Sequence, residues 1–239
     1  DSGLDLDSDG SLGGPNDAYG FGVFPGQYGM LVLSKYPISV EGVRTFQDFL
    51  WKDMPDSLLP REYYGEAADA LRLSSKSHWD VPIEVNGKTL HVLASHPTPP
   101  TFDGPEDRNG KRNHDEIRLT ADYIDGAEYL YDDNGVRGGL AEGESFVVLG
   151  DQNSDPIDGD SVDGAIAQLL DHPRVQDPAP TSVSYGTDTA DFADPVPGDL
   201  RVDYVLPSSE LTVTGSAVYW PADAEHPSDH RLVWVDLEI

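Results

Sequence analysis

The stretch Ser228-Asp229-His230-Arg231-Leu232-Val233-Trp234-Val235, close to the C-terminal end of the chain, is the most informative part of the sequence. The apolar-rich run Leu232–Ile239 predicts a β-strand. Asp229 and His230 come just before it, and a carboxylate beside an imidazole can transfer protons or bind a metal ion. The stretch therefore predicts a functional site at the start of the last strand.

Three other strand-like runs carry the same kinds of side chain. They are the run that ends in Ser95-His96, the run that ends in Gly150-Asp151-Gln152-Asn153, and Val202–Leu206 with Asp203 inside it. Each has an ordinary structural explanation when taken alone, since Asp and Asn are common turn formers and a single His is more often structural or exposed. Together, runs that each deliver Asp, Asn or His predict one shared site.

The chemistry of these side chains suits phosphate. Asp151 can bind a hard cation or accept a proton from water. Asn153 can donate a hydrogen bond to a phosphoryl oxygen from the same turn, and His96 can stabilise the charge of a phosphate or protonate a leaving group. Asp203 requires a partner, because burying a carboxylate without one is costly.

The ordered motifs S-H (Ser95-His96), G-D-x-N (Gly150 to Asn153), V-D-Y-V (Val202 to Val205) and S-D-H (Ser228 to His230) resemble the endonuclease/exonuclease/phosphatase superfamily. That superfamily includes deoxyribonucleases, sphingomyelinases and inositol-polyphosphate phosphatases. The resemblance covers roughly residues 30–239. It implies an α/β fold, a four-layer α/β/β/α sandwich of two mixed β-sheets flanked by helices. It also implies hydrolysis of phosphomonoesters or phosphodiesters with Mg²⁺ or Mn²⁺.

The resemblance also implies roles for individual residues. Asp151 orients or deprotonates the attacking water, Asn153 holds a phosphoryl oxygen, and His96 lies against the phosphate. Asp203 and His230 form a pair that fixes the imidazole. The implied catalytic residues are His96, Asp151, Asn153, Asp203 and His230, and the implied metal ligands at the active site are Asp151, Asn153 and Asp229.

One departure from the superfamily concerns its N-terminal strands. The family supplies an Asn from its first strand and a metal-binding Glu from its second, whereas residues 1–29 contain no Glu. We expect an N-terminal segment absent from this sequence to complete one sheet and the principal metal site. The alternative is a remnant with an impaired metal site. The expected organisation is an acidic loop region over 1–29 and a family domain over 30–239 that lacks its first strands.

The acidic region contains a candidate calcium loop. Asp5, Asp7 and Asp9 alternate and are followed by Gly10, which is the opening of a calcium-binding loop. Asn16 occupies the twelfth position, where an acid is expected, and Asp17 follows as a substitute. The sequence predicts Ca²⁺ at Asp5, Asp7 and Asp9, with a merely acidic flexible segment as the alternative.

A cluster of cations precedes the central hairpin. Arg72, Lys76 and His78 lie close together in the sequence, and Arg112 belongs to a weaker cluster farther along the chain. In an acidic protein such groups are candidate phosphate-binding residues. The alternative role is to guard the edge of a sheet against pairing with another chain.

The remaining local structure follows from periodicity and turn signals. Asn86-Gly87 between Val81–Val85 and Lys88–Leu93 predicts a hairpin with a two-residue type I′ turn. Residues 44–66 predict an irregular segment with short helical turns. Other predicted elements are strands at Met30–Leu33 and Phe146–Leu149, a helix over 114–131 capped by Asn113 with Glu116 as capping-box partner, and a short helix over Val162–Leu170.

Composition limits the function. The chain has 239 residues, no cysteine, and 44 acidic against 15 basic residues, for a net charge of −29. Such a surface repels long nucleic acid, and no run is apolar and long enough to span a membrane. The leading hypothesis is a metal-dependent phosphoesterase acting on a phosphorylated small molecule or lipid headgroup, extracellular or at the cell surface. Its alternatives are a secreted nuclease and a non-catalytic, calcium-stabilised domain.

Overall fold

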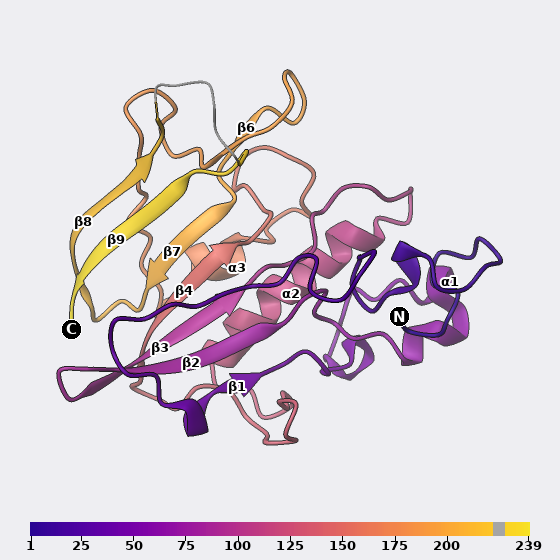
Figure 1. Cartoon of the computed structure of the whole chain (residues 1–239), viewed down its shortest axis with the longest axis horizontal. Coiled ribbons are helices and arrows are strands. Elements are labelled where there is room, and N and C mark those ends of the chain that lie inside the picture. The colour runs from indigo at the N-terminus through magenta and orange to yellow at the C-terminus, as the bar shows by residue number, and fades with distance from the viewer. Residues whose placement is uncertain (222–227) are drawn as a thin grey trace.

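The computed structural model describes residues 1–221 and 228–239, and its centre is a five-stranded mixed sheet (Figure 1). β3 and β4 are parallel, whereas the other neighbouring strands are antiparallel. In spatial order the strands are β1 (Arg44–Thr45), β2 (His78–Val85), β3 (Lys88–Ser95), β4 (Ser145–Asp151) and β7 (Asp203–Pro207). The mixed α/β fold class predicted from the sequence is confirmed.

Two smaller sheets accompany the central one. β5 (Ala190–Asp191) pairs with β6 (Asp199–Leu200), and β8 (Thr212–Tyr219) pairs with β9 (Leu232–Glu238). The predicted C-terminal strand is therefore present, and β9 lies beside β7 (Figure 1). β8 was not predicted from the sequence.

The two faces of the central sheet have separate hydrophobic cores. On one face, Phe146 and Val148 pack with Ile117 and Ile124 of α2 (Arg108–Ile124), the longest helix. On the other face, residues such as Val81 and Val92 are covered by extended segments that include Val32 and Ile38. The remaining helices are short: α1 (Arg61–Tyr64), α3 (Ala167–Leu170) and the 3-10 turns Pro15–Asp17, Val40–Gly42, Trp51–Asp53 and Gly65–Asp69.

The hairpin and the irregular segment agree with the sequence-based predictions. Asn86 and Gly87 both have positive φ, 52° and 82°, as a type I′ turn requires. Residues 44–66 contain only short strand and helical pieces. None of the helices in the described ranges is long and apolar enough to cross a bilayer.

Three predicted elements are wrong in existence or extent. Met30–Leu33 is extended but forms no strand, and its Leu31 and Leu33 side chains are 78% and 84% exposed. The helix predicted over 114–131 begins at Arg108 and ends at Ile124, because Asn113 and Glu116 use their side chains on neighbouring loops instead of capping. Of the helix predicted over Val162–Leu170, only Ala167–Leu170 is α-helical.

Gly150 allows β4 to approach the end of β3. Its φ of +137° is open only to glycine, and an added Cβ would lie 2.0 Å from the Ser95 carbonyl oxygen. We expect Gly150→Ala to lower the free energy of unfolding by about 3 kcal/mol, from backbone strain and overpacking together. Urea denaturation measures this loss. Gly215→Ala is the control, since a Cβ there meets only ordinary contacts at 3.4 Å or more; equal losses in the two variants would contradict the argument.

Candidate active site

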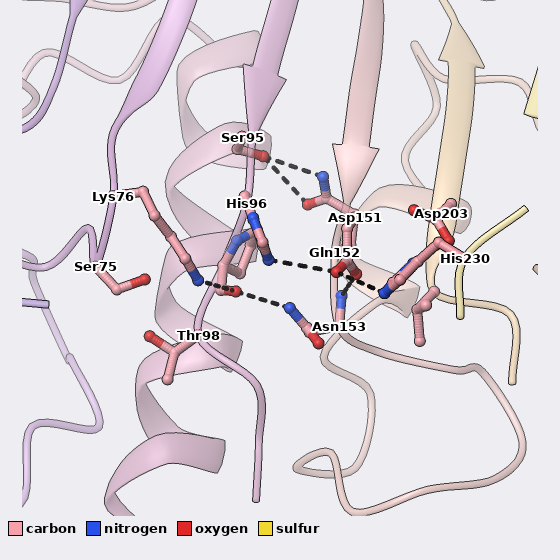
Figure 2. Close-up of polar contacts among 12 residues, drawn as sticks. Ser75, Lys76, Ser95, His96, Thr98, Asp151, Gln152, Asn153, Asp203 and His230 are labelled. Carbon is pink, nitrogen blue, oxygen red and sulfur yellow. Dashed lines mark hydrogen bonds and ion pairs between the residues drawn. The ribbon is translucent and has the colours of Figure 1, made fainter. Parts of the chain in front are cut away.

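The topology of the central sheet brings the predicted site residues to one edge. β3 and β4 run parallel, so His96 and Asp151 emerge at the same edge. β7 is antiparallel to β4, and Asp203 at its start lies opposite Asp151. His230 joins them because its backbone forms an isolated bridge with Ala190 of β5. Figure 2 shows these side chains facing one another.

Asp151 lies between two imidazoles. Its Oδ2 atom is 3.3 Å from Nε2 of His96 and 3.8 Å from Nε2 of His230. On the far side of the second ring, His230 Nδ1 is 2.8 Å from Asp203 Oδ2. The predicted pairing of Asp203 with His230 is therefore present in the geometry, and a chain of alternating acids and imidazoles crosses the site.

The Asp203–His230 pair fixes the charge of the imidazole. The hydrogen bond to Asp203 raises the pKa of His230 to about 9, against the opposing effect of burial. Burial in turn raises the pKa of Asp203. Thr189 donates its hydroxyl to Asp203 Oδ2 at 2.9 Å, and the Phe192 ring packs edge-on against the His230 ring. At neutral pH the ring is protonated and held in one orientation.

Asn153 and Lys76 complete the polar rim of the site. Asn153 adopts a left-handed conformation with φ of 51°, and its N–H donates to Asp151 Oδ1 at 2.8 Å. Its Nδ2 and the Nζ of Lys76 both donate to the Pro97 carbonyl, at 3.0 Å and 3.1 Å (Figure 2). Burial lowers the pKa of the Lys76 amine, although the carboxylates of Glu116 and Asp151 oppose this.

A cavity of about 1130 Å³ opens onto this cluster. Seven of the residues predicted for the active site line it, namely Lys76, His96, Arg112, Asp151, Asn153, Asp229 and His230. Aromatic side chains contribute to the same wall: Phe21, Tyr28, Tyr64, Phe102 and Phe192. The cavity therefore combines a charged cluster with an apolar surface large enough for more than a phosphate group.

Two residues predicted to bind substrate lie elsewhere. Arg72 forms an ion pair with Asp48 at 2.7 Å and stacks on the Tyr19 ring, outside the cavity lining. His78 is buried, and its two ring nitrogens lie 3.0 Å from Ser74 Oγ and 2.9 Å from the Glu116 carbonyl oxygen. The position of His78 in β2 directs its side chain into the core.

Arg112 lines the cavity, but its guanidinium mainly donates hydrogen bonds to backbone carbonyls. Its Nε donates to the Leu73 carbonyl at 2.8 Å, and its Nη2 donates to the carbonyls of Arg72 and Tyr19 at 2.6 Å and 2.5 Å. The guanidinium therefore ties the N-terminal region to the segment before β2. Asp229 is exposed at the cavity wall.

The donor set at the sheet edge fits a hard divalent cation. One ligand atom each from Asp151, Asp203 and His230 lies within 4.8 Å of the other two. The carboxylate oxygens of this group suit Mg²⁺ or Mn²⁺, whereas the His230 ring, protonated beside Asp203, does not bind a cation. Asp203 and His230 are bonded to each other, which leaves Asp151 as the best-placed ligand of the group.

The acidic loop gathers a second set of carboxylates. Atoms of Asp5, Asp7 and Asp9 also lie within 4.8 Å of one another, and Asn16 Nδ2 donates to Asp7 Oδ2 at 2.9 Å. Asp17 does not join them as a substitute ligand. It is buried, and its carboxylate accepts the N–H groups of Leu6 and Gly14.

Sequence reasoning missed several residues around the site. Thr189, which supports Asp203, lies in a loop with no motif. Gln152 sits inside the G-D-x-N motif, yet its side chain turns into the core and bonds Ser95 (Figure 2). The only available signal was the position of Gln152 between Asp151 and Asn153, and this position does not indicate where the Gln152 side chain points.

Comparisons with known proteins agree with this geometry. A family model described as endonuclease/exonuclease/phosphatase family matches residues 2–230. The endonuclease/exonuclease/phosphatase structure from Beutenbergia cavernae DSM 12333 has a TM-score of 0.56 and 19% identity, covering 86% of this chain and 46% of that one. This chain thus spans about half the length of that protein. A search of curated proteins returns no match.

Two other solved structures are similar at lower TM-scores. Sphingomyelinase C from Streptomyces griseocarneus has a TM-score of 0.44 and 17% identity, covering 85% of this chain and 62% of that one. A beta toxin variant from Staphylococcus aureus with bound magnesium ions has a TM-score of 0.45 and 16% identity, with the same coverage of 85% and 62%. Because the family model matches nearly the whole sequence, the chain belongs to the endonuclease/exonuclease/phosphatase family.

Proposed function

We propose that the protein is a metal-dependent phosphoesterase that hydrolyses a phosphomonoester or a phosphodiester. The observation that carries this proposal is the position of Asp151, whose carboxylate lies between the imidazoles of His96 and His230 at the wall of one cavity. Family membership supports it, because proteins of this family are generally hydrolytic phosphoesterases.

Each side chain of the site has a separate role in an in-line attack on phosphorus. Asp151 orients the attacking water and accepts its proton, since the residue lines the cavity and its Oδ2 lies between the two imidazoles, while Oδ1 is held by the Asn153 N–H. His96, the protonated His230 ring and Lys76 stabilise the negative charge that the phosphoryl oxygens carry. Asn153 contributes an amide to the same oxygens, and Asp203 keeps the His230 ring oriented.

Asp151, Asn153 and Asp229 are the proposed ligands of Mg²⁺ or Mn²⁺. A divalent cation there supplies charge neutralisation to the phosphoryl group. The carboxylate of Asp151 and the exposed Asp229 both line the cavity, which supports the assignment.

The proposed substrate is a phosphorylated small molecule or a lipid headgroup. The net charge of −29 disfavours long nucleic acid, whereas the aromatic side chains of the cavity provide apolar surface for an organic group. An extracellular or cell-surface location is the corresponding proposal, because a strongly acidic surface keeps a protein soluble in salt.

Hydrolysis assays test the proposal directly. With Mg²⁺ or Mn²⁺, we expect phosphate release from small phosphate esters, or cleavage of lipid-headgroup diesters, and much slower nicking of plasmid DNA. A chelator should abolish turnover. Plasmid nicking at a rate equal to or above that of small esters would favour the nuclease alternative. Absence of turnover on every ester would overturn the proposal.

Calcium binding by Asp5, Asp7 and Asp9 is a separate proposal. A bound cation would relieve the repulsion among these clustered carboxylates, and a ligand that binds only the folded state stabilises it. We expect Ca²⁺ at 100 times its Kd to add about 2.7 kcal/mol to the free energy of unfolding. Calorimetry on the parent and on Asp7→Asn measures it. An equal calcium response in both would contradict the assignment.

A further inference from the structure

We infer that Asn113 and Glu116, two buried residues on one face of α2, position the three segments that carry the catalytic groups. These segments are 75–76, 96–98 and 151–153. The inference rests on the proposed function for its catalytic meaning, but the contacts themselves do not depend on it. Neither residue itself lines the cavity, so both are positioning residues.

Glu116 holds the first two segments together. It is 0% exposed, and its Oε1 accepts the N–H of Ser75 at 2.7 Å and the Ser75 hydroxyl at 3.1 Å. Its Oε2 accepts the N–H of Thr98 at 2.6 Å. Ser75 precedes Lys76 directly, and Thr98 follows His96 by two residues. One carboxylate therefore sets the spacing between the Lys76 amine and the His96 imidazole.

Asn113 holds the second and third segments together. It is also 0% exposed, and its Nδ2 donates to the carbonyls of Thr98 and Gln152, each at 2.9 Å, with a longer contact to Asn153 at 3.4 Å. Gln152 lies between Asp151 and Asn153 in the chain. The amide therefore sets the spacing between the loop of His96 and the turn of Asp151.

These contacts act beyond the point where the ladder between β3 and β4 ends. The ladder between β3 and β4 ends at the pair Ala94 and Leu149, so His96 and Asp151 lie beyond its last rung. Ser95 and Gln152 add one side-chain link beyond it. Farther out, Thr98 is held at its N–H by Glu116 and at its carbonyl by Asn113, which are three residues apart and share a helix face.

A purely structural role is the alternative, and α2 supplies a matched control for it. Asp115 is 0% exposed, and its Oδ2 accepts the Trp51 indole N–H at 2.6 Å and the Leu58 N–H at 2.7 Å. Asp115 thus holds the segment 51–58 by buried hydrogen bonds, as Glu116 holds the catalytic loops. Its removal costs comparable hydrogen bonds without touching the site.

The test compares Asn113→Ala, Glu116→Ala and Asp115→Ala, all in the full chain. Each loses buried hydrogen bonds, and alanine preserves the helix. Hydrogen–deuterium exchange should accelerate over 96–98 and 151–153 for Asn113→Ala, over 75–76 and 96–98 for Glu116→Ala, and over 51–58 alone for Asp115→Ala. With a hydrolysed ester, kcat should fall about 100-fold in the first two variants with little change in KM, since small displacements of reacting groups cost that much.

Two outcomes would overturn the inference: unchanged exchange in the three catalytic segments, or a loss of kcat in Asp115→Ala equal to that in Glu116→Ala. If an alanine variant fails to fold, Asn113→Asp and Glu116→Gln keep the size of the side chain while reversing one donor or acceptor. If the parent protein hydrolyses no ester, the proposed function fails. The exchange pattern alone then tests the positioning role. Faster exchange in the three segments would support that role, and unchanged exchange would contradict it.

Discussion

Replacing Asp151 by asparagine is expected to lower kcat/KM for phosphoester hydrolysis by about 1000-fold. The amide preserves the shape of the side chain and can still accept the Asn153 N–H, which now bonds Oδ1 at 2.8 Å. It cannot take a proton from water, and it binds a divalent cation more weakly than a carboxylate does. The loss therefore falls on the chemical step and not on the fold.

The control for this variant is Asp56→Asn. Asp56 is exposed, is not part of the cavity lining, and has a φ of 51°, a conformation that asparagine also tolerates. It removes the same unit of charge, so it separates a site effect from a change in net charge. Kinetics with a small phosphate ester and thermal melts on both variants provide the comparison. A near-parental rate in Asp151→Asn would remove Asp151 from the catalytic role.

The sequence was most informative where local chemistry and strand order agree. The Asn86-Gly87 turn and the strands around it could be predicted because positive φ at two adjacent residues has few solutions. The strand beginning at Leu232 could be predicted from its apolar-rich run. Met30–Leu33 looked equally strand-like, but a strand requires a hydrogen-bonded partner, and among the described residues this segment has none in a ladder.

In the candidate site, too, some residues could be predicted from the sequence and others could not. His96, Asp151 and His230 could be placed together from their positions at strand ends, because topology carries strand ends to one edge. Asn113 and Glu116 resembled a capping box, since spacing cannot distinguish a cap from two side chains that reach other loops. His78 was predicted to be a phosphate ligand because the direction of its side chain depends on the register of β2, which the sequence does not give.

His230→Ala is expected to reduce kcat/KM by about 100-fold or more while the protein remains folded. The side chain is 30% exposed, so its loss removes little of the core. What is lost is a cation beside Asp151, held in place by Asp203. A collapse of the melting temperature, with no separate loss of turnover in the folded fraction, would instead make His230 a structural residue.

Asp203→Asn tests the same pair through pH. The hydrogen bond to Asp203 raises the pKa of His230 to about 9, so the ring stays protonated below that pH and loses its charge above it. Without the carboxylate, the pKa falls, and the alkaline limb of the pH–rate profile should move down by about 1–2 pH units. At pH 6 the ring is protonated more fully in both proteins, so their rates should differ least there.

A double-mutant cycle then decides whether the two residues act as a unit. If Asp203 works only by charging and orienting the His230 ring, its substitution has nothing left to remove once the ring is gone. The variant carrying both His230→Ala and Asp203→Asn should therefore be no slower than His230→Ala alone. Additive losses would mean that Asp203 serves the reaction independently, as a ligand of the cation through the oxygen that now faces the ring.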